Sequence, residues 1–373
     1  MPVASADILQ GGRFPPLEPR PTEAPAEPIT HGECRAALTG TVRFEHMVVD
    51  SSHGGTDRPL RVSVVACAYN EAQNIEGFLL SVLRSLQRSF TLQEVICVVS
   101  GSTDGTEAIV REMARRDARV RPIIQSERTG KAAALSLGLS AARGEVIVVE
   151  NADTVPLPES LERLVATFQN PRIQLACSHP VPVPTRPGWT GRIGTALWEV
   201  HDRVSRRMPK AGEAFAIRAP AIMIPWDVED DDTYVGICAG LRMGSSVYVP
   251  EAIILNRVPE TVTDYFHQRF RVNSNILQLW QRRRLRSSTW QARYVVPALL
   301  EAIRADPDRL PGLLGLIGSE MLIRAAALLA NRLRRRPRET WPPIESTKFA
   351  ILRTGTTRPR RVASEARRAV PGR

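Results

Sequence analysis

An aspartate placed directly after an apolar run is the first sign of chemistry in this chain. The four apolar residues at 146–149 are too few for a helix and rich in β-branched side chains, which is typical of a buried strand. The chain then turns polar at Asn151 and Asp153, and prolines at 156 and 158 exclude an immediate helix. Open α/β sheets bind ligands at the carboxyl ends of their strands. Asp153 is therefore a candidate functional carboxylate, although an aspartate here is also a common turn residue.

Three more strand–helix units precede this stretch and predict the sheet that positions it. The apolar runs VSVVACAY, EVICVV and VRPII predict strands, and a predicted helix follows each of them. In the first helix, Ile75, Phe78, Leu79, Val82 and Leu83 recur at the three- and four-residue spacing of one helical face. Four strands alternating with three helices predict an α/β fold with a parallel sheet built from right-handed βαβ units.

The positive charge of the chain is concentrated at its carboxyl end. The formal net charge is +11, but residues 331–373 hold 13 Lys and Arg against three Glu, a net charge of +10. The rest of the chain is almost neutral, so the composition does not indicate a nucleic-acid partner. The five cysteines form no CxxC pair, which indicates neither a disulfide framework nor a zinc site. The amino terminus lacks the apolar run of a signal peptide.

Composition and pattern divide the chain into four predicted parts. Residues 1–60 are rich in Pro and small polar residues, and at least the first 30 are predicted to be disordered. Residues 61–281 form the α/β domain, 282–336 a helical extension, and 337–373 a basic tail. A chain of 373 residues allows this organisation together with a sizeable core.

Six short segments occur in the order and spacing of a known family. They are VSVVACAYNEAQNIEGFL, GSTDGT, GKAAALSLGL, ENAD, the acidic run EDDD and QRFR. Each motif is weak alone, but together, from about Arg61 to Gln281, they resemble the glycosyltransferase family 2 and its GT-A fold. The resemblance implies a Rossmann-like, mostly parallel sheet flanked by helices. It also implies transfer of a sugar from a nucleotide-diphosphate sugar, with inversion at the anomeric carbon.

The resemblance implies a donor site with a divalent metal ion. Donor-binding residues are expected at Tyr69, Asn70, Glu71, Asp104, Lys131, Asn151 and Asp153. Lys131 begins a predicted helix, from which a cation can reach a diphosphate. Asp153 matches the second Asp of the family's D-x-D motif, which binds the metal that bridges the diphosphate. Mg²⁺ or Mn²⁺ suits this position, because hard cations prefer oxygen ligands and neutralise a charged leaving group.

The resemblance also implies a catalytic base in the acidic run 229–232. Crowded carboxylates raise the pKa of some members of the run, which suits a base. Because Tyr234 and Val235 begin an apolar face, we predict that the base is Asp230 or Asp231, with Asp230 first. A solvated loop or the start of a helix is the alternative for the other acids of the run.

Three further polar residues have predicted places near the reaction. Gln268 and Arg271 match the first two conserved positions of the family's Q-x-x-R-W motif and are expected near the acceptor and the diphosphate. Glu213 is left open between a place beside the acceptor and an ion pair with Lys210.

The chain departs from the family's pattern at three places. Val99 and Ser100 replace the usual Asp pair, which puts uracil in doubt as the donor base and leaves guanine or another base open. Asn151 replaces the first Asp of D-x-D, so metal use is expected to differ or to be weaker. Val272 replaces the Trp that accompanies processive synthesis, which favours single addition.

Residues 313–336 predict a helix with one charged stripe. Placed at about 100° per residue, Glu320, Arg324, Asn331 and two arginines at 334 and 335 fall within an arc of about 100°. Charges inside the apolar run argue against a spanning helix. We predict an interfacial helix, with the Arg-rich tail beside anionic headgroups. A helix packed on the catalytic domain and a spanning helix are the alternatives.

The sequence therefore predicts a metal-dependent inverting glycosyltransferase. Its expected partners are a nucleotide-diphosphate sugar, a carbohydrate or lipid-linked acceptor and an anionic membrane surface, without nucleic acid. It is expected in the cytoplasm, peripheral to the inner face of the cell membrane. A nucleotidyltransferase is disfavoured because CAYNEAQN, and not a glycine-rich loop, follows the first strand. A non-catalytic, membrane-associated scaffold remains the other alternative.

Overall fold

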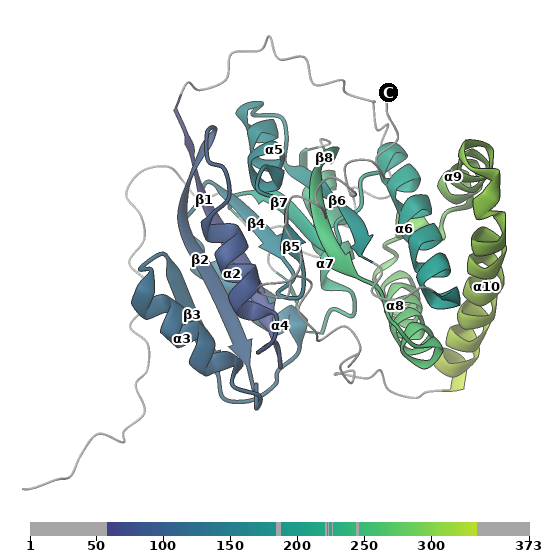
Figure 1. The fold of residues 1–373 in the computed structure, drawn as a ribbon, viewed down its shortest axis with the longest axis horizontal. Helices are drawn as coiled ribbons and strands as arrows, with labels where there is room; N and C mark the ends of the chain where they lie inside the picture. Colours follow the sequence, from purple (N-terminus) through teal and green to yellow (C-terminus); the bar gives the residue numbers. More distant parts are fainter. Residues whose placement is uncertain are drawn as a thin grey trace, which may run out of the picture.

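The fold is built on one mixed β-sheet. The computed structural model describes residues 58–183, 188–220, 222, 224–225, 227–243 and 246–333. Among these residues, eight strands pair in the order β3-β2-β1-β4-β7-β6-β8-β5 (Figure 1). They are β1 (Leu60–Ala68), β2 (Phe90–Ser100), β3 (Val120–Gln125), β4 (Val146–Glu150), β5 (Val155–Pro156), β6 (Leu175–Val183), β7 (Ala214–Arg218) and β8 (Ser246–Arg257).

The first four strands form the parallel half that the sequence predicts. β1 pairs with β2 and β4, and β2 pairs with β3, all in parallel. Every residue of β4 is buried, which explains its short apolar run without polar alternation. β7 then runs antiparallel between β4 and β6, and it brings a later part of the chain beside the end of β4. The predicted α/β class is confirmed.

Helices cover both faces of this sheet. The first face carries α2 (Ile75–Leu83), α3 (Thr106–Arg116) and α5 (Ser160–Ala166), whose apolar residues share one core cluster with the strands. The opposite face carries α4 (Lys131–Ala141) and α7 (Asp231–Met243), which share a second cluster. Helices α2, α3 and α4 follow the parallel strands β1, β2 and β3, so they begin next to the carboxyl ends of these strands, where their first turns can face a ligand.

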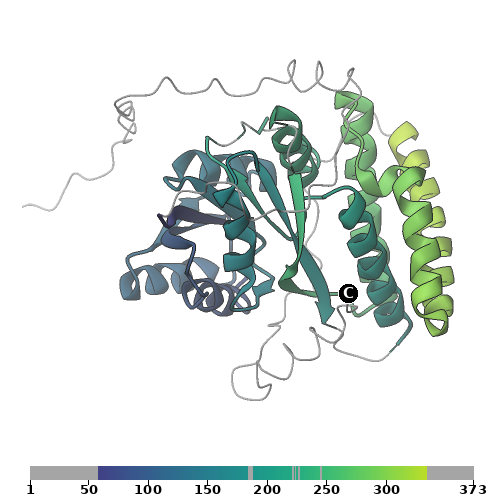
Figure 2. The same ribbon diagram turned by 90° about the horizontal axis from the view of Figure 1, so that it is seen from above.

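A separate layer of helices lies beside the sheet. It contains α6 (Trp189–Arg207), α8 (Val262–Arg283), α9 (Ala292–Ala305) and α10 (Leu310–Leu333), which pack around a third apolar cluster. In Figure 2 the green and yellow helices of this layer stand to one side of the strands. Helix α8 continues past residue 281, so the helical layer begins inside the segment predicted as the α/β domain. Of the predicted N-terminal segment 1–60, residues 1–57 lie outside the described residues, as does the tail after residue 333.

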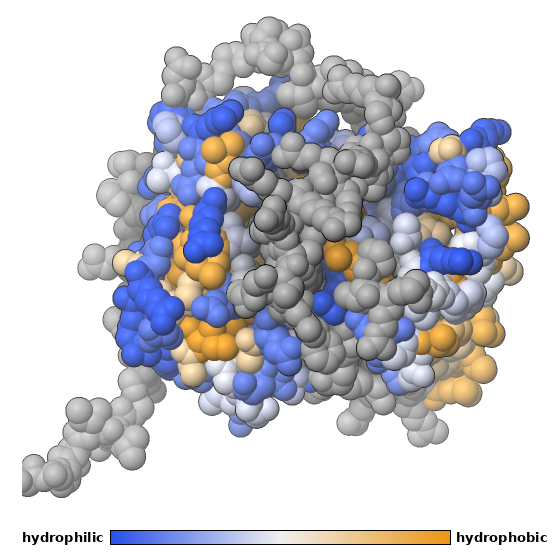
Figure 3. Space-filling view, in the orientation of Figure 1, coloured by the Kyte–Doolittle hydropathy of each residue, from blue (hydrophilic) through white to orange (hydrophobic). Residues whose placement is uncertain are grey.

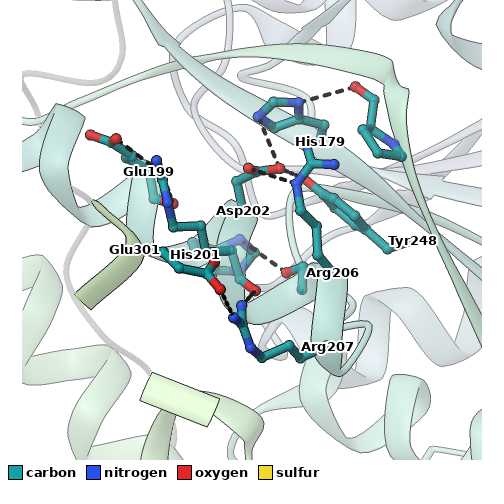
Figure 4. A network of polar contacts seen from close by, with 11 residues as sticks. His179, Glu199, His201, Asp202, Arg206, Arg207, Tyr248 and Glu301 are labelled. Carbon is teal, nitrogen blue, oxygen red and sulfur yellow. Dashed lines mark hydrogen bonds and ion pairs between the residues drawn. The ribbon is translucent and has the colours of Figure 1, made fainter. Parts of the chain in front are cut away.

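A buried polar network fixes α6 to the sheet (Figure 4). The Tyr248 hydroxyl donates to Asp202 Oδ1 at 2.7 Å, and Arg206 Nε donates to Asp202 Oδ2 at 3.0 Å. His179 Nδ1 lies 3.0 Å from the Pro250 carbonyl, and its Nε2 lies 3.7 Å from Asp202 Oδ1. Since Asp202 is buried, losing these partners would leave an uncompensated charge. The network therefore holds α6 in a fixed position against β6 and β8.

Helix α10 packs with its charged side toward the protein. Glu320 accepts hydrogen bonds from Arg269 Nε at 2.6 Å and from Arg324 Nε at 3.3 Å. The Tyr265 hydroxyl lies 3.1 Å from Ser319 Oγ. An interfacial helix with its charged stripe toward water does not describe this arrangement, because Glu320 faces α8 and Arg324 lies against Thr289 and Trp290. The sequence pattern identified the charged stripe of α10. It could not show that Glu320 is buried, because its partner Arg269 lies 51 residues away in the chain.

The outer side of α10 is apolar. At about 100° per residue, its exposed apolar side chains fall within an arc of about 140°. They are Leu310, Leu314, Met321, Leu322, Leu328, Leu329 and Leu333. Figure 3 shows an orange surface at this edge of the molecule. Within the described part of the chain, one helical stretch, Pro307–Leu333, is long and apolar enough by length and composition to cross a membrane.

Candidate functional site

The carboxyl ends of the parallel strands open into a cavity of about 500 Å³. Its walls come from the start of α4, the loop before β7, the start of α7 and the inner sides of α6, α8, α9 and α10. Lys131, Glu213, Asp230, Asp231 and Arg271 all line it. The cavity thus joins the end of the sheet, where α/β folds bind ligands, to the separate helical layer.

The loop after β1 is bound to the loop after β2 by hydrogen bonds. The Asn70 backbone N–H donates to Ser102 Oγ at 3.1 Å, and the Thr103 backbone N–H donates to Asn70 Oδ1 at 2.9 Å. Asn70 has a φ of 53°, a left-handed conformation that asparagine tolerates better than most residues. Its side chain and backbone therefore hold the two predicted donor loops together.

Asp104 and Glu71 complete this loop contact. Asp104 accepts from the Ala72 backbone N–H at 2.9 Å and from Thr106 Oγ1 at 2.5 Å. Burial opposes its ionisation, but these hydrogen bonds outweigh burial and lower the pKa of Asp104. Glu71 Oε2 accepts from Asn74 Nδ2 at 2.8 Å. Helix α3 is capped by Gly105, and Asp104 Oδ1 accepts from the Thr106 backbone N–H of its first turn at 3.1 Å.

An arginine that the sequence did not single out lies over Tyr69, one of the predicted donor-binding residues. The Arg128 guanidinium carbon is 4.0 Å from the centre of the Tyr69 ring. The loop of Arg128 passes so close to the end of β2 that a Cβ on Gly101 would lie 2.6 Å from the Arg128 nitrogen. Gly101 also has a φ of +62°, so this approach requires glycine. The position of Arg128 just before the GKAAAL motif was the sequence signal that could have identified this arginine.

Lys131 crosses the cavity entrance to the start of α7. Its Nζ lies 2.7 Å from Asp232 Oδ2 and 3.4 Å from Asp231 Oδ2. Burial works against the charged amine, but the two carboxylates outweigh burial and raise the pKa of Lys131 well above its ordinary value. Helix α4 begins at Lys131, as the sequence predicts. The lysine therefore stays positive and joins the predicted donor side to the predicted catalytic acids.

Glu213 lies beside the predicted metal position. The Asn151 side-chain amide donates to Glu213 Oε2 at 2.7 Å, and the Asn151 backbone N–H donates to the Glu213 carbonyl at 3.0 Å. Burial, with the charge of Asp153 as the next cause, raises the pKa of Glu213 to about 7. Lys210 Nζ instead donates to the Ala211 carbonyl at 3.2 Å. Glu213 lines the cavity, and its place beside the acceptor stays a prediction.

Arg271 supplies positive charge among these acids. It projects from α8 into the cavity, one turn after Gln268, which lines the same wall. Burial lowers the pKa of Arg271, and the charges of three nearby carboxylates oppose that effect: Asp153, Glu213 and Asp231. Since an arginine remains protonated under such shifts, Arg271 is a fixed cation facing the metal position and the start of α7.

Asp230 and Asp231 are held at the start of α7. Asp230 Oδ1 accepts from the Thr233 backbone N–H at 3.2 Å, and its carbonyl accepts from the Tyr234 backbone N–H at 2.9 Å. Asp230 is thus the cap of the helix. Burial raises the pKa of Asp230, and burial together with the neighbouring Asp232 raises the pKa of Asp231 to about 7. Acids in this range can exchange a proton near neutral pH.

The acidic groups suit a divalent cation that shares its ligands with a substrate. Among the described residues, no cluster of three or more His, Cys, Asp or Glu side chains is arranged to hold a metal ion. Asp153 and Glu213 are close enough for the charge of one to raise the pKa of the other. Mg²⁺ is commonly bound by one or two carboxylates plus substrate phosphates. The residues therefore fit a metal that binds together with a diphosphate.

The sheet order and the acidic cavity at the ends of its parallel strands define a GT-A fold. Two family models match the chain. The glycosyl transferase family 2 model covers residues 63–223, and the glycosyl transferase family group 2 model covers residues 146–333, just over half of the chain. The chain belongs to the family 2 glycosyl transferases.

The individual relatives share about a quarter to a third of the aligned residues with this chain. The chain is 26% identical over 288 residues to glycosyltransferase AglD of Haloferax volcanii, a match that covers 72% of this chain and 46% of that protein. It is 32% identical over 110 residues to an undecaprenyl-phosphate 4-deoxy-4-formamido-L-arabinose transferase of Proteus mirabilis, over 29% and 34%. These matches span a third to a half of the relatives' length.

One of the solved structures that match is that of mannosyltransferase PcManGT from Pyrobaculum calidifontis, in complex with GDP-Man and Mn²⁺. It is 22% identical with a TM-score of 0.48, covering 82% of this chain and 83% of that one.

Proposed function

We propose that this protein transfers a sugar from a nucleotide-diphosphate sugar to an acceptor hydroxyl, with inversion at the anomeric carbon. The observation that best supports this proposal is the content of one cavity, which holds two cationic side chains together with two acids whose pKa values are about 7. Lys131 and Arg271 supply positive charge, while Glu213 and Asp231 have pKa values of about 7. A departing diphosphate needs cations, and an attacking hydroxyl needs a proton acceptor. Membership of the family supports the same reaction.

The donor half of the site binds and orients the diphosphate. Arg271 and Lys131 face the space in front of β4, where they attract the phosphate oxygens. Asp153, with Glu213 beside it, holds the divalent ion in this proposal. When bound, that ion supplies charge neutralisation for the leaving diphosphate. The Tyr69 ring, covered by Arg128, offers a flat surface for the nucleotide base.

The acceptor half removes a proton from the attacking hydroxyl. Asp230 is the first candidate for the base, because Lys131 forms its ion pairs with Asp231 and Asp232. Asp230 is held through one oxygen by the Thr233 backbone N–H. This leaves the other oxygen to accept a proton from the acceptor. Asp231 is the second candidate, since its pKa of about 7 suits general base catalysis.

A nucleotide-diphosphate screen tests this function directly. Because a ligand that binds only the native state raises its stability by mass action, a matching nucleoside diphosphate at about 100 times its Kd raises stability by about 2.7 kcal/mol. We expect a rise in Tm with one nucleoside diphosphate, enlarged by Mn²⁺, and slow release of the same diphosphate from the matching sugar nucleotide. Absence of any stabilised pair would contradict the proposal. Binding without sugar release or transfer would favour the scaffold, and release of pyrophosphate a nucleotidyltransferase.

A peripheral position on the membrane accompanies this function in our proposal. The outer side of α10 exposes a stripe of leucines, with Leu322 62% and Leu329 59% exposed. Helix α10 also packs on α8 through the contact of Glu320 with Arg269 and on α6 through apolar residues, which suits a helix that lies along a membrane surface. The basic residues after 333 would then face anionic headgroups at the cytoplasmic face.

Replacing two exposed leucines tests this position. Leu322→Asp with Leu329→Asp should lower binding to anionic vesicles by roughly tenfold or more, because each removes apolar area from the bilayer contact. Leu137→Asp, at a 39% exposed leucine on α4, is the matched control and should bind like the wild type. Vesicle co-sedimentation at low and high salt is the measurement. Equal binding by both variants would reject α10 as the membrane contact.

A further inference from the structure

The cavity has two chemically different ends. One end holds the charged groups of the proposed reaction, from Lys131 to Arg271. The other end runs between α6, α8, α9 and α10, and the apolar side chains that line it are Leu197, Val200, Val295, Leu299, Leu316 and Ile317. A reaction between a sugar nucleotide and a small polar acceptor uses only the charged end. The apolar end is therefore an extension that the proposed reaction does not explain.

The polar residues within the apolar end are neutral or already paired. Glu320 accepts hydrogen bonds from Arg269, Arg324 and Asn273, so its buried charge is compensated by the protein itself. His201 also lines the cavity, and burial lowers its pKa well below the ordinary value, which keeps the ring uncharged at neutral pH. The remaining wall favours hydrocarbon over a hydrated sugar, since burying hydroxyls without partners is costly.

The apolar end opens at the exposed apolar side of α10. Met321 lines the cavity, yet it is 69% exposed. At about 100° per residue it lies about 20° from Leu314 and from Leu328, both exposed apolar residues of the same helix. A hydrocarbon chain passing Met321 would leave the cavity onto this apolar surface and stay out of water. The surface thus connects the cavity with the side proposed to contact the membrane.

We propose that the acceptor is a membrane amphiphile, whose hydroxyl-bearing head lies at Asp230 and whose hydrocarbon tail occupies the apolar end of the cavity and leaves past Met321. This inference rests on the proposed function for the role of the head. The site proposed for the tail is supported independently by the apolar end of the cavity and by the exposed apolar side of α10. The charged end of the cavity, its apolar end and the exposed apolar side of α10 are continuous. They therefore fit a single ligand that has a polar head and a hydrocarbon tail.

Alkyl maltosides of increasing chain length, brominated on the chain, probe the tail site. Trp198 lines the cavity, so a bound bromoalkyl chain should quench its fluorescence. Below micelle-forming concentrations, affinity should rise about fourfold per methylene from octyl to dodecyl until the cavity is filled, the equivalent of ~0.8 kcal/mol per buried methylene. Trp198→Phe should lose the corresponding quenching. Affinity without chain-length dependence would overturn the proposal.

Adjacent residues on α9 provide matched variants. Val295→Phe places a ring in the cavity and should lower dodecyl maltoside affinity at least tenfold, whereas Val296→Phe, at a 50% exposed neighbour, should not. Leu299→Phe and the 46% exposed Leu300→Phe form a second pair, in case the first does not fold. Equal loss within a foldable pair, or no loss in either variant, would place the alkyl chain outside the cavity and overturn the proposal.

Nucleotide binding separates this inference from the proposed function. Each variant is also tested for stabilisation by the nucleoside diphosphate and Mn²⁺. If the wild type binds the nucleotide but shows no chain-length dependence for the maltosides, the tail site alone is wrong. If it binds the alkyl chain in the cavity but no nucleotide, the transferase proposal fails and the apolar site remains.

Discussion

Asp153→Ala is expected to abolish the Mn²⁺-dependent part of nucleotide-diphosphate binding and to lower kcat/KM by about a thousandfold or more. The reason is that Asp153, three residues after the buried strand β4, is the carboxylate whose charge acts on both Glu213 and Arg271. Without it, Glu213 remains beside the metal position, and burial, the largest cause of its raised pKa, still opposes the ionised form that binds a cation. Metal neutralisation of a leaving group contributes several kcal/mol to transition-state stabilisation, which gives the expected magnitude.

Calorimetric titration of the nucleoside diphosphate with and without Mn²⁺ measures this effect. Asp308→Ala removes an exposed carboxylate in the turn Pro307–Arg309, which does not line the cavity, and is the control for the lost charge. We expect the control to keep the metal dependence of the wild type. If Asp153→Ala keeps it as well, Asp153 is not the metal ligand.

The parallel half of the fold was predictable because its signals are local. Strands such as β4 are buried on both faces and appear in the sequence as short apolar runs. The helix starting at Lys131 was also readable, since the Gly before it and the Ala/Leu pattern after it are neighbours in the chain. The positions of Asn70 and Asp153 after their strands followed directly from this order.

The partners of the site residues were not predictable, because they come from distant parts of the chain. Lys131 meets Asp232 across 101 residues. Glu213 reaches Asn151 only because β7 runs antiparallel to β4 and pairs Ala214 with Glu150. A sequence without aligned relatives carries no signal for this pairing, so Glu213 stayed open between two roles. The assignments of individual site residues to donor, base and metal remain predictions.

The side of α10 that faces the protein was undetermined for a similar reason. Helical periodicity separates the charged stripe from the leucines, but it does not say which stripe is buried. Arg269 on α8 decides the matter, since its guanidinium and that of Arg324 compensate the buried Glu320. The result exposes leucines in place of charges, which strengthens the case for a membrane contact on physical grounds different from the expected ones.

Asp230→Asn is expected to lower kcat by about 10²- to 10⁴-fold while leaving the affinity for the nucleotide diphosphate nearly unchanged. The magnitude is that of losing a general base, and asparagine keeps the hydrogen bond that Asp230 accepts from the Thr233 backbone N–H. Burial raises the pKa of Asp230, and the base acts only when ionised. The wild-type rate should therefore rise with pH through that raised pKa, and the residual rate of Asp230→Asn should lose this dependence.

Three neighbouring variants identify the base by comparison. Asp231→Asn tests the second candidate, whose pKa is about 7, and Glu213→Gln tests the acid beside Asp153. Asp232→Asn is the matched control, because Asp232 pairs with Lys131 and should act on donor affinity more than on kcat. Steady-state kinetics over pH 5–9 separates these cases. If only Asp231→Asn loses the rise of the rate with pH, Asp231 is the catalytic base in place of Asp230. Wild-type turnover in both Asp230→Asn and Asp231→Asn would show that neither aspartate is the base.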